Sequence, residues 1–178
     1  APELQRYITD LFEQSGMSRE DASYCGYAMV QTNLLGIDSH GVLRAPIYLE
    51  RLQSGAVNAA PNIEVISGGL ALEVLDGDDG LGYVVGKAAM ERAIELAERF
   101  NMGAVGVTHS NHFGAAALYA QMATQRGMIG IVMTNVKPNI VAPGGSKPIA
   151  GNNPIAIGIP TFAEFPFMLD ISLSNVAG

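Results

Sequence analysis

Apolar residues recur every three or four positions along the first third of the chain, and this spacing predicts amphipathic helices. Helices are expected over residues 3–14, 18–35 and 43–53, and they end near Gly16, Gly36 and Gly55. Ser18, with Asp21 three residues later, resembles a capping box in which the acid is one methylene shorter than the usual glutamate. Three helices before any strand predict a small N-terminal helical subdomain, residues 1–56.

The pattern changes after residue 56. Two short strands are expected on either side of Ser67-Gly68-Gly69, which is typical of a hairpin turn. Strands and helices then alternate: a helix at 81–100, a strand at 104–109, a helix at 114–127, and strands at 129–135, 155–160 and 167–172. A loop rich in proline and glycine is expected over residues 136–154. The alternation predicts an α/β fold in which helices cover a mixed sheet that is parallel at least in part.

Composition narrows the class of protein. Of the 178 residues 48% are hydrophobic and 15% charged, which is typical of a folded globular chain. The net charge of −7 argues against nucleic acid or an anionic membrane as the main partner. No apolar stretch approaches the roughly 20 residues of a spanning helix. Cys25 is the only cysteine, so no intrachain disulfide can form, and a reducing cytoplasmic location is expected.

A serine, a histidine and an arginine come together at the start of the third expected helix. If that helix begins near Val42, Ser39 and His40 lie at its positive end and Arg44 lies in its first turn. A guanidinium binds a carboxylate with two parallel hydrogen bonds, and an imidazole can transfer a proton near neutral pH. The alternative is a capping serine, a packed histidine and a solvated arginine. The spacing alone leaves both readings open.

Two more histidines follow an expected strand, in the sequence THSNHFGAA. Ligands of open α/β sheets bind where strands end in this way. His109 and His112 could form a metal pair, but no third ligand is placed nearby, so no metal site is predicted. They could instead line a cofactor or substrate cleft. The remaining alternative is a plain loop in which Ser110 and Asn111 cap the next helix.

The usual signatures of a nucleotide site are missing. The segment GDDGLGYVVG lacks the third glycine of the dinucleotide fingerprint, because Val85 stands at that position. Residues 142–154 are glycine-rich and could approach a ligand closely, or simply cross the surface. Asp170 ends an apolar strand, and a buried acid needs a partner. That partner could be a backbone amide or a cation, or, more interestingly, a ribose hydroxyl or a catalytic histidine.

Four segments, in their order and separation, resemble the malate/L-lactate dehydrogenase type 2 family. They are DSHGVLRAPIYLERLQSGAVNAAP, THSNHFGAAALYA, GGSKPIAGNNPIAIGIP and FMLDISLS, and the resemblance covers essentially the whole chain. The family includes malate, lactate, sulfolactate and ureidoglycolate dehydrogenases, and reductases of diketogulonate and piperideine carboxylate. It implies an NAD(P)-binding fold unlike the Rossmann domain, which agrees with the missing glycine.

The resemblance also implies residue roles. His40 and His112 match two histidines that compete for the role of acid/base, and Arg44, beside Ser39, matches the arginine that holds the substrate carboxylate. Four positions match residues that line the nicotinamide cofactor: Val136, Asp170, Ile171 and Ser172. Many members have a methionine where Ile171 stands, so a backbone contact is expected to survive there.

The implied activity is reversible hydride transfer between NAD or NADP and a small 2-oxo or 2-hydroxy acid, in a homodimer. Members are about twice as long as this chain, so residues 57–178 are expected to be the first half of the cofactor domain, and the chain alone is expected to be inactive. Three alternatives are a carboxylate-binding module without catalysis, a reductase of a cyclic imino acid and a histidine–metal hydrolase.

Overall fold

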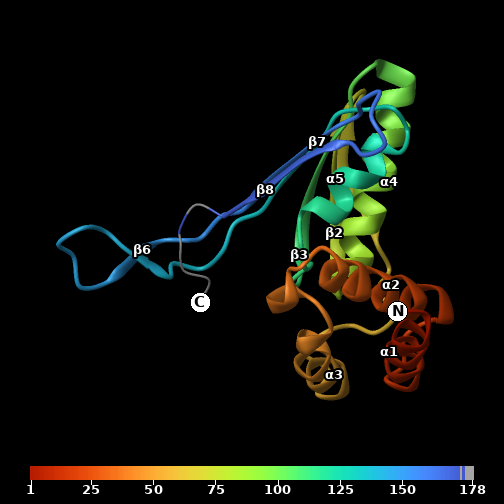
Figure 1. Cartoon of the computed structure of the whole chain (residues 1–178), viewed down its shortest axis with the longest axis vertical. Helices are drawn as coiled ribbons and strands as arrows, with labels where there is room; N and C mark the ends of the chain where they lie inside the picture. Colours follow the sequence, from red (N-terminus) through yellow and green to blue (C-terminus); the bar gives the residue numbers. More distant parts are fainter. Residues whose placement is uncertain (173, 175–178) are drawn as a thin grey trace. The chain divides into compact units, whose positions relative to one another are not determined.

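The computed structural model describes residues 1–172 and 174. The chain divides into two compact units, Ala1–Ala115 and Ala116–Gly178 (Figure 1). Unit 1 contains the helices of the first third of the chain and a three-stranded sheet, and unit 2 contains a second three-stranded sheet with one helix against it. The predicted domain boundary at residue 56 stays a prediction.

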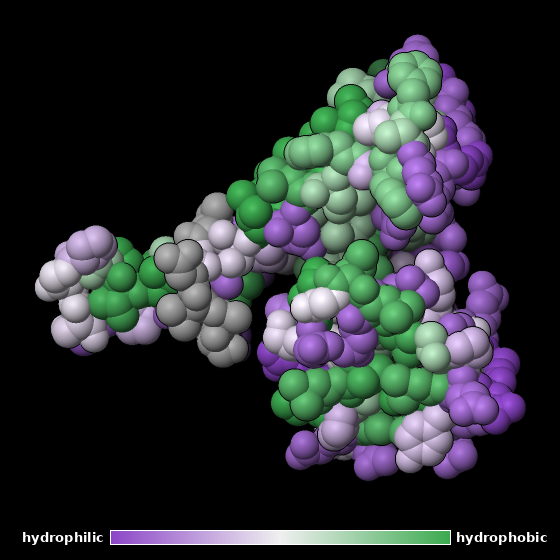
Figure 2. Space-filling model, viewed as in Figure 1, coloured by the Kyte–Doolittle hydropathy of each residue, from purple (hydrophilic) through white to green (hydrophobic). Residues whose placement is uncertain are grey.

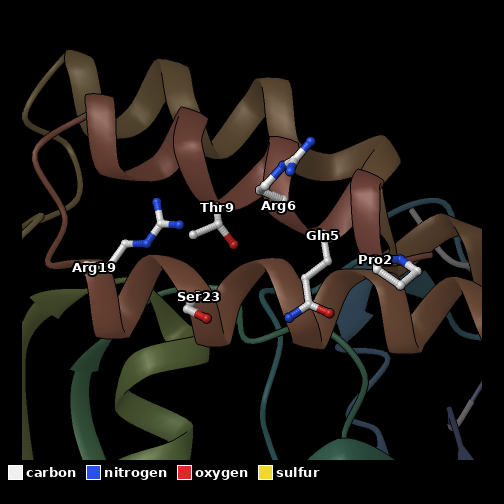
Figure 3. A pocket seen from close by; sticks show the side chains of 6 residues that line it. All are labelled: Pro2, Gln5, Arg6, Thr9, Arg19 and Ser23. Carbon is white, nitrogen blue, oxygen red and sulfur yellow. The ribbon is translucent and has the colours of Figure 1, made fainter.

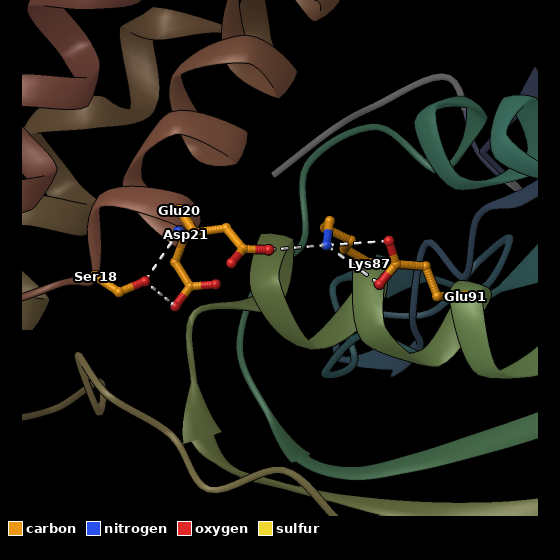
Figure 4. Close-up of polar contacts among 5 residues, drawn as sticks. All are labelled: Ser18, Glu20, Asp21, Lys87 and Glu91. Carbon is orange, nitrogen blue, oxygen red and sulfur yellow. Dashed lines mark hydrogen bonds and ion pairs between the residues drawn. The ribbon is translucent and has the colours of Figure 1, made fainter.

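The first two helices form where the apolar spacing predicts them, as α1 (Pro2–Gln14) and α2 (Arg19–Leu34). The Ser18 hydroxyl oxygen accepts the backbone N–H of Asp21 at 3.1 Å, which caps α2 (Figure 4). The Asp21 carboxylate accepts the Ser18 hydroxyl proton at 2.7 Å. The predicted cap is therefore confirmed.

Helices α1 and α2 cross closely. A Cβ added at Gly26 would lie 2.6 Å from the Thr9 hydroxyl, so only glycine permits this approach. The contact buries Phe12, Cys25 and Met29 completely. Lys87 of α4 (Gly82–Phe100) links α2 to α4, since its ammonium lies 3.9 Å from Glu20 of α2 and 3.0 Å from Glu91 of its own helix (Figure 4).

The third helix begins later than expected. Residues 38–44 form two 3₁₀ turns, Asp38–His40 and Val42–Arg44, and α3 spans Ala45–Gln53. The cause is Asn33, at the end of α2, whose amide oxygen accepts the Val42 N–H at 2.8 Å and whose amide nitrogen donates to Asp38. Pro46 then favours a helix start here, because a proline in the first turn needs no N–H partner.

The sheet of unit 1 has the order β1-β2-β3, with strands Glu64–Gly69, Leu72–Gly80 and Ala104–Ser110. Strands β1 and β2 are antiparallel, and β2 and β3 are parallel with α4 as the connection. The hairpin turn lies at residues 70–71, after the predicted Ser67-Gly68-Gly69, which belongs to β1. Leu70 adopts a positive φ of 52° there.

Unit 2 is built on the antiparallel order β4-β7-β8, with strands Gly130–Met133, Ile155–Ile159 and Phe167–Ile171. Its helix α5 (Ala117–Thr124) is shorter than the predicted 114–127, because Gly114 and Gly127 both have a positive φ. The prediction of an irregular loop over 136–154 is wrong in part. That segment contains a two-stranded ribbon, β5 (Ile140–Val141) and β6 (Pro148–Ala150).

The two faces of the β4-β7-β8 sheet differ. Ala156 is completely buried, and Gly158 lies against the Ala120 and Thr124 positions of α5. Side chains of the opposite pleat are half-buried or exposed, and they form cross-strand rows: Ile131–Ile157–Leu169, Met133–Ile155–Ile171 and Ile159–Phe167. Figure 2 shows hydrophobic surface along β7 and β8. One face of this sheet therefore carries rows of apolar side chains that are half-buried or exposed.

The predicted fold class is confirmed: N-terminal helices precede mixed sheets with helices against them. Among the strands that the structure describes, only β2 and β3 form a parallel ladder, which is unlike the all-parallel sheet of a Rossmann domain. No helix within residues 1–172 is long and apolar enough to cross a membrane.

Candidate active site

The serine, histidine and arginine singled out in the sequence lie in the two 3₁₀ turns. The Arg44 Nε donates to the Ser39 carbonyl oxygen at 2.8 Å, so the backbone of one turn orients the guanidinium of the next. The Ser39 hydroxyl is 2.8 Å from Nδ1 of His40. Arg44 keeps its two terminal amino groups beyond the orienting bond, and those are the groups that bind a carboxylate in parallel.

His112 reaches the same place from the loop that follows β3. The rings of His40 and His112 stack with their centroids 5.3 Å apart and their planes at 28°. A buried tyrosine of α3, Tyr48, places its hydroxyl 2.6 Å from Nδ1 of His112. The two histidines that the sequence places far apart therefore share one site in unit 1.

Asn111 holds the His112 loop to its neighbours. Its amide oxygen accepts from Arg51 of α3 at 2.7 Å, and its amide nitrogen donates to the carbonyls of Asp79 and Gly80. Asn111 thus fastens the loop to α3 and to the end of β2. It does not cap α5, which begins only at Ala117.

The electrostatic environment keeps His112 neutral. Desolvation, as the largest cause, and the nearby charges of His40, Arg44 and Arg51 together lower its pKa to about 4. The residue still has a solvent-exposed side. At neutral pH the ring is therefore uncharged, and one of its nitrogens carries a lone pair that can accept a proton.

His109 belongs to a different contact. Its Nδ1 lies 3.0 Å from the Asp76 carboxylate of β2, and this hydrogen bond raises the pKa of His109. His109 and His112 therefore have separate partners. Within the part of the chain that the structure describes, no three His, Cys, Asp or Glu residues gather in a way that could hold a metal ion.

The residues expected to line the cofactor all lie in unit 2. The Val136 N–H donates to the side chain of Asn153 at 2.9 Å, and the Ser174 N–H donates to that of Asn152 at 3.0 Å. These neighbouring asparagines tie two distant segments to the start of β7. Ile171 pairs with Ile155 across the β7–β8 ladder, and the Ser172 hydroxyl donates to the Ser174 carbonyl at 2.7 Å.

Asp170 has a structural partner. Its carboxylate accepts the backbone N–H of Ala117 at 2.9 Å, in the first turn of α5. An acid in this position satisfies an otherwise unpaired amide and interacts favourably with the helix dipole. Of the two readings left open for Asp170, the tie to a backbone amide is present. A role toward the cofactor stays a prediction.

The chemical character of these residues is compatible with one end of a nicotinamide dinucleotide. Val136 and Ile171 keep 40% and 45% of their surface exposed, and such apolar side chains can lie against a flat heteroaromatic ring. The Ser172 hydroxyl and nearby backbone groups can bind a carboxamide.

A hollow of about 270 Å³ lies away from these residues, between α1 and α2 (Figure 3). Arg6, Thr9, Arg19 and Ser23 are among the residues that line it. Arg19 is already bound by the carboxylates of Asp10 at 2.7 Å and Glu13 at 2.5 Å.

The match to known proteins covers every residue. The family model described as malate/L-lactate dehydrogenase matches residues 1–178. The chain belongs to the malate/L-lactate dehydrogenase family. It is 42% identical to a malate dehydrogenase of Pyrococcus abyssi over 98% of this chain and 48% of that protein.

Solved structures of family members agree with the fold. The malate dehydrogenase from Pyrococcus horikoshii OT3 superposes with a TM-score of 0.93 at 44% identity, over 97% of this chain and 49% of that one. The sulfolactate dehydrogenase from Methanocaldococcus jannaschii superposes with a TM-score of 0.92 at 39% identity, over 98% and 50%. The chain spans about half the length of the curated relatives it matches.

Relatives are named for both nicotinamide cofactors. A ureidoglycolate dehydrogenase (NAD(+)) of Escherichia coli K12 is 33% identical over 88% of this chain and 45% of its own length. A (2R)-3-sulfolactate dehydrogenase (NADP(+)) of Chromohalobacter salexigens is 34% identical over 98% and 52%. The names of these relatives therefore do not favour NAD over NADP for this chain.

Sequence reasoning missed two residues of the site. Tyr48 and Tyr83 are both buried, and each contacts one of the histidine segments. Tyr48 lies four residues after Arg44, on the same side of the chain as it enters α3, and this spacing could have indicated it. Tyr83 follows the incomplete glycine fingerprint and carries no comparable signal.

Proposed function

We propose that this chain carries the substrate-binding and proton-transfer groups of an NAD(P)-dependent 2-hydroxy acid dehydrogenase. The observation that supports it is the stacking of His40 on His112, beside an arginine whose guanidinium is already oriented. Malate, lactate and sulfolactate share a carboxylate next to a hydroxyl. Such a molecule needs a cation and a proton acceptor within one small site.

Arg44 binds the carboxylate in this proposal. The bond from Nε to the Ser39 carbonyl fixes the plane of the guanidinium before substrate arrives, which lowers the entropy lost on binding. The backbone carbonyl also offsets part of the cost of placing a cation just before the start of α3. The substrate is thereby held with its hydroxyl-bearing carbon toward the two imidazoles.

His112 accepts and returns the substrate proton in this proposal. Because its pKa is lowered to about 4, the ring is neutral at pH 7 and can take the hydroxyl proton as the substrate is oxidised. In the reverse direction the same nitrogen returns the proton to the oxygen of the 2-oxo acid. His40 packs against this ring and contacts Ser39, so it orders the site and contributes to the low pKa of its neighbour.

When bound, NAD or NADP supplies the hydride chemistry. Val136, Ile171 and Ser172 would hold its nicotinamide end, the first two through apolar contact and the last through its hydroxyl. Asp170 stabilises this region by accepting the Ala117 N–H, which fixes the start of α5. The homodimer and the cytoplasmic location stay predictions of the family resemblance.

Replacing Arg44 by Lys tests the assignment. A single ammonium cannot reproduce two parallel hydrogen bonds, so KM for the acid should rise about 10-fold to 100-fold in the complete protein, while KM for the cofactor changes little. Steady-state rates with malate, lactate, sulfolactate and ureidoglycolate, each with NAD and NADP, measure this and identify the substrate. An unchanged KM for every acid would refute the role of Arg44.

A further inference from the structure

Two buried tyrosines contact the segments that carry the stacked histidines. Tyr48 comes from α3 and Tyr83 from the first turn of α4, and they are 2% and 0% exposed. Their rings meet edge to face with centroids 5.8 Å apart. Buried tyrosine hydroxyls need hydrogen-bond partners, and both of these find theirs in the histidine segments.

Tyr48 is the side-chain partner of His112. Its hydroxyl lies 2.6 Å from Nδ1, and the backbone N–H of Gly114 donates to the same nitrogen over a longer 3.4 Å. With Nδ1 bonded on the protein side, Nε2 is the nitrogen that can meet a substrate. The ring planes of Tyr48 and His112 are also nearly parallel, at 27°, so packing and hydrogen bonding fix the imidazole in the same orientation.

A hydroxyl suits this position better than a carboxylate or an amide would. It can both donate and accept, so it can stay bonded to Nδ1 whether that nitrogen carries a proton or a lone pair. A carboxylate would also raise the pKa of the imidazole, whereas a neutral phenol leaves the ring uncharged at neutral pH. A reversible reaction needs both protonation states of His112, and Tyr48 can accompany each of them.

Tyr83 contacts both of the segments that carry the histidines. Its hydroxyl donates to the backbone carbonyl of His40 at 3.0 Å. The loop after His112 lies directly on its ring, because a Cβ at Gly114 would be 2.5 Å from the ring carbon Cε1. One tyrosine therefore contacts both the turn that carries His40 and the loop that carries His112.

We propose that Tyr48 and Tyr83 are positioning residues for proton transfer: Tyr48 directs Nε2 of His112 toward the substrate, and Tyr83 keeps the two histidine segments together. This inference rests on the proposed dehydrogenase function for its kinetic consequence. Its structural consequence, the orientation and tautomer of His112, does not depend on that function.

The test is Tyr48→Phe in the complete protein, with Tyr7→Phe as the control. Both remove only a hydroxyl, but Tyr7 is 61% exposed on α1. For Tyr48→Phe, kcat should fall about 10-fold to 100-fold while KM for the acid stays within about threefold, because Arg44 is untouched. The ¹⁵N shifts of the His112 ring should move as Nδ1 loses its partner. Tyr7→Phe should change none of these.

Tyr83→Phe keeps the test meaningful if Tyr48→Phe folds poorly. It should broaden or shift the ring signals of both His40 and His112, since the bond to the His40 carbonyl is lost. If the His112 shifts and kcat are unchanged in a folded Tyr48→Phe protein, the positioning role is refuted. It is also refuted if kcat falls but the ring shifts stay the same. If the shifts move in a protein that oxidises no 2-hydroxy acid, the positioning stands and the proposed function fails.

Discussion

The two units differ in how much of their structure they complete by themselves. In unit 1 the segments that carry the groups proposed for catalysis are held by side-chain hydrogen bonds from α2, α3, α4 and the loop after β3. In unit 2 the β4-β7-β8 sheet has α5 on one face and apolar side chains on the other. Polar contacts in unit 1 define a site, whereas the open apolar face of unit 2 remains available for further packing.

This difference determines how much each unit depends on contacts beyond its own. A hydrogen-bonded cluster of histidine, arginine and tyrosine keeps its geometry through local contacts. A sheet with one bare apolar face gains further stability when that face is covered, because burying apolar area is the main source of stability. Substitutions at three positions, Gly114, Asp170 and His109, test how strongly each unit depends on its internal contacts.

The largest effect is expected at Gly114 of unit 1. Gly114→Ala places a methyl group against the Tyr83 ring at a φ of +77°, so it should lower the free energy of unfolding by about 2–5 kcal/mol and reduce activity with it. Gly55→Ala is the matched control, since its φ is +73° with no atom near the added Cβ, and about 1–2 kcal/mol is expected. Urea unfolding measures both. Equal losses would show that the contact with Tyr83 contributes nothing.

A smaller effect is expected at Asp170 of unit 2. Asp170→Ala removes the acceptor for the Ala117 N–H and should cost about 0.5–2 kcal/mol. Asp170→Asn keeps an acceptor oxygen and should cost less. Hydrogen exchange at the Ala117 amide reports the bond directly. Unchanged protection of this amide in Asp170→Ala would mean that the carboxylate does not hold α5.

The smallest effect concerns the exposed pair His109 and Asp76. The pKa of His109 is raised by the hydrogen bond to Asp76, so its contribution to stability is present below its unfolded pKa near 6.5 and is lost as pH rises through the folded value. The pKa of Asp76 is lowered, first by the Asp78 N–H and then by His109, and its contribution is lost as pH falls below about 4. Wild type should therefore exceed His109→Gln in stability near pH 5 and match it near pH 9. A difference that persists at pH 9 would contradict the pairing.

Much of the secondary structure could be predicted, and the errors have identifiable causes. The cap at Ser18 and the helix at 81–100 depend on neighbouring residues, and both are confirmed. The start of α3 was predicted too early because Asn33, nine residues before Val42, pulls that segment into 3₁₀ turns. The ribbon within 136–154 was missed because pairing across a glycine-rich segment leaves no alternating pattern.

The residues of the candidate site also fall into those that could be predicted from the sequence and those that could not. His40, Arg44 and His112 could be proposed from residue type and family resemblance, and the structure brings the two histidines together. Tyr48 and Tyr83 could not be separated from ordinary core tyrosines, because their role depends on which loop lies above them.

The sequence alone was enough to predict most helices and strands, the acidic character and the family of this protein. Each of these follows from composition, from short-range spacing or from motifs of consecutive residues. The tertiary structure decided which histidine meets which hydroxyl, where Asp170 finds its partner, and which sheet face stays bare. Those outcomes depend on contacts between residues far apart in the chain, and only the packing of whole elements brings such residues within hydrogen-bonding distance.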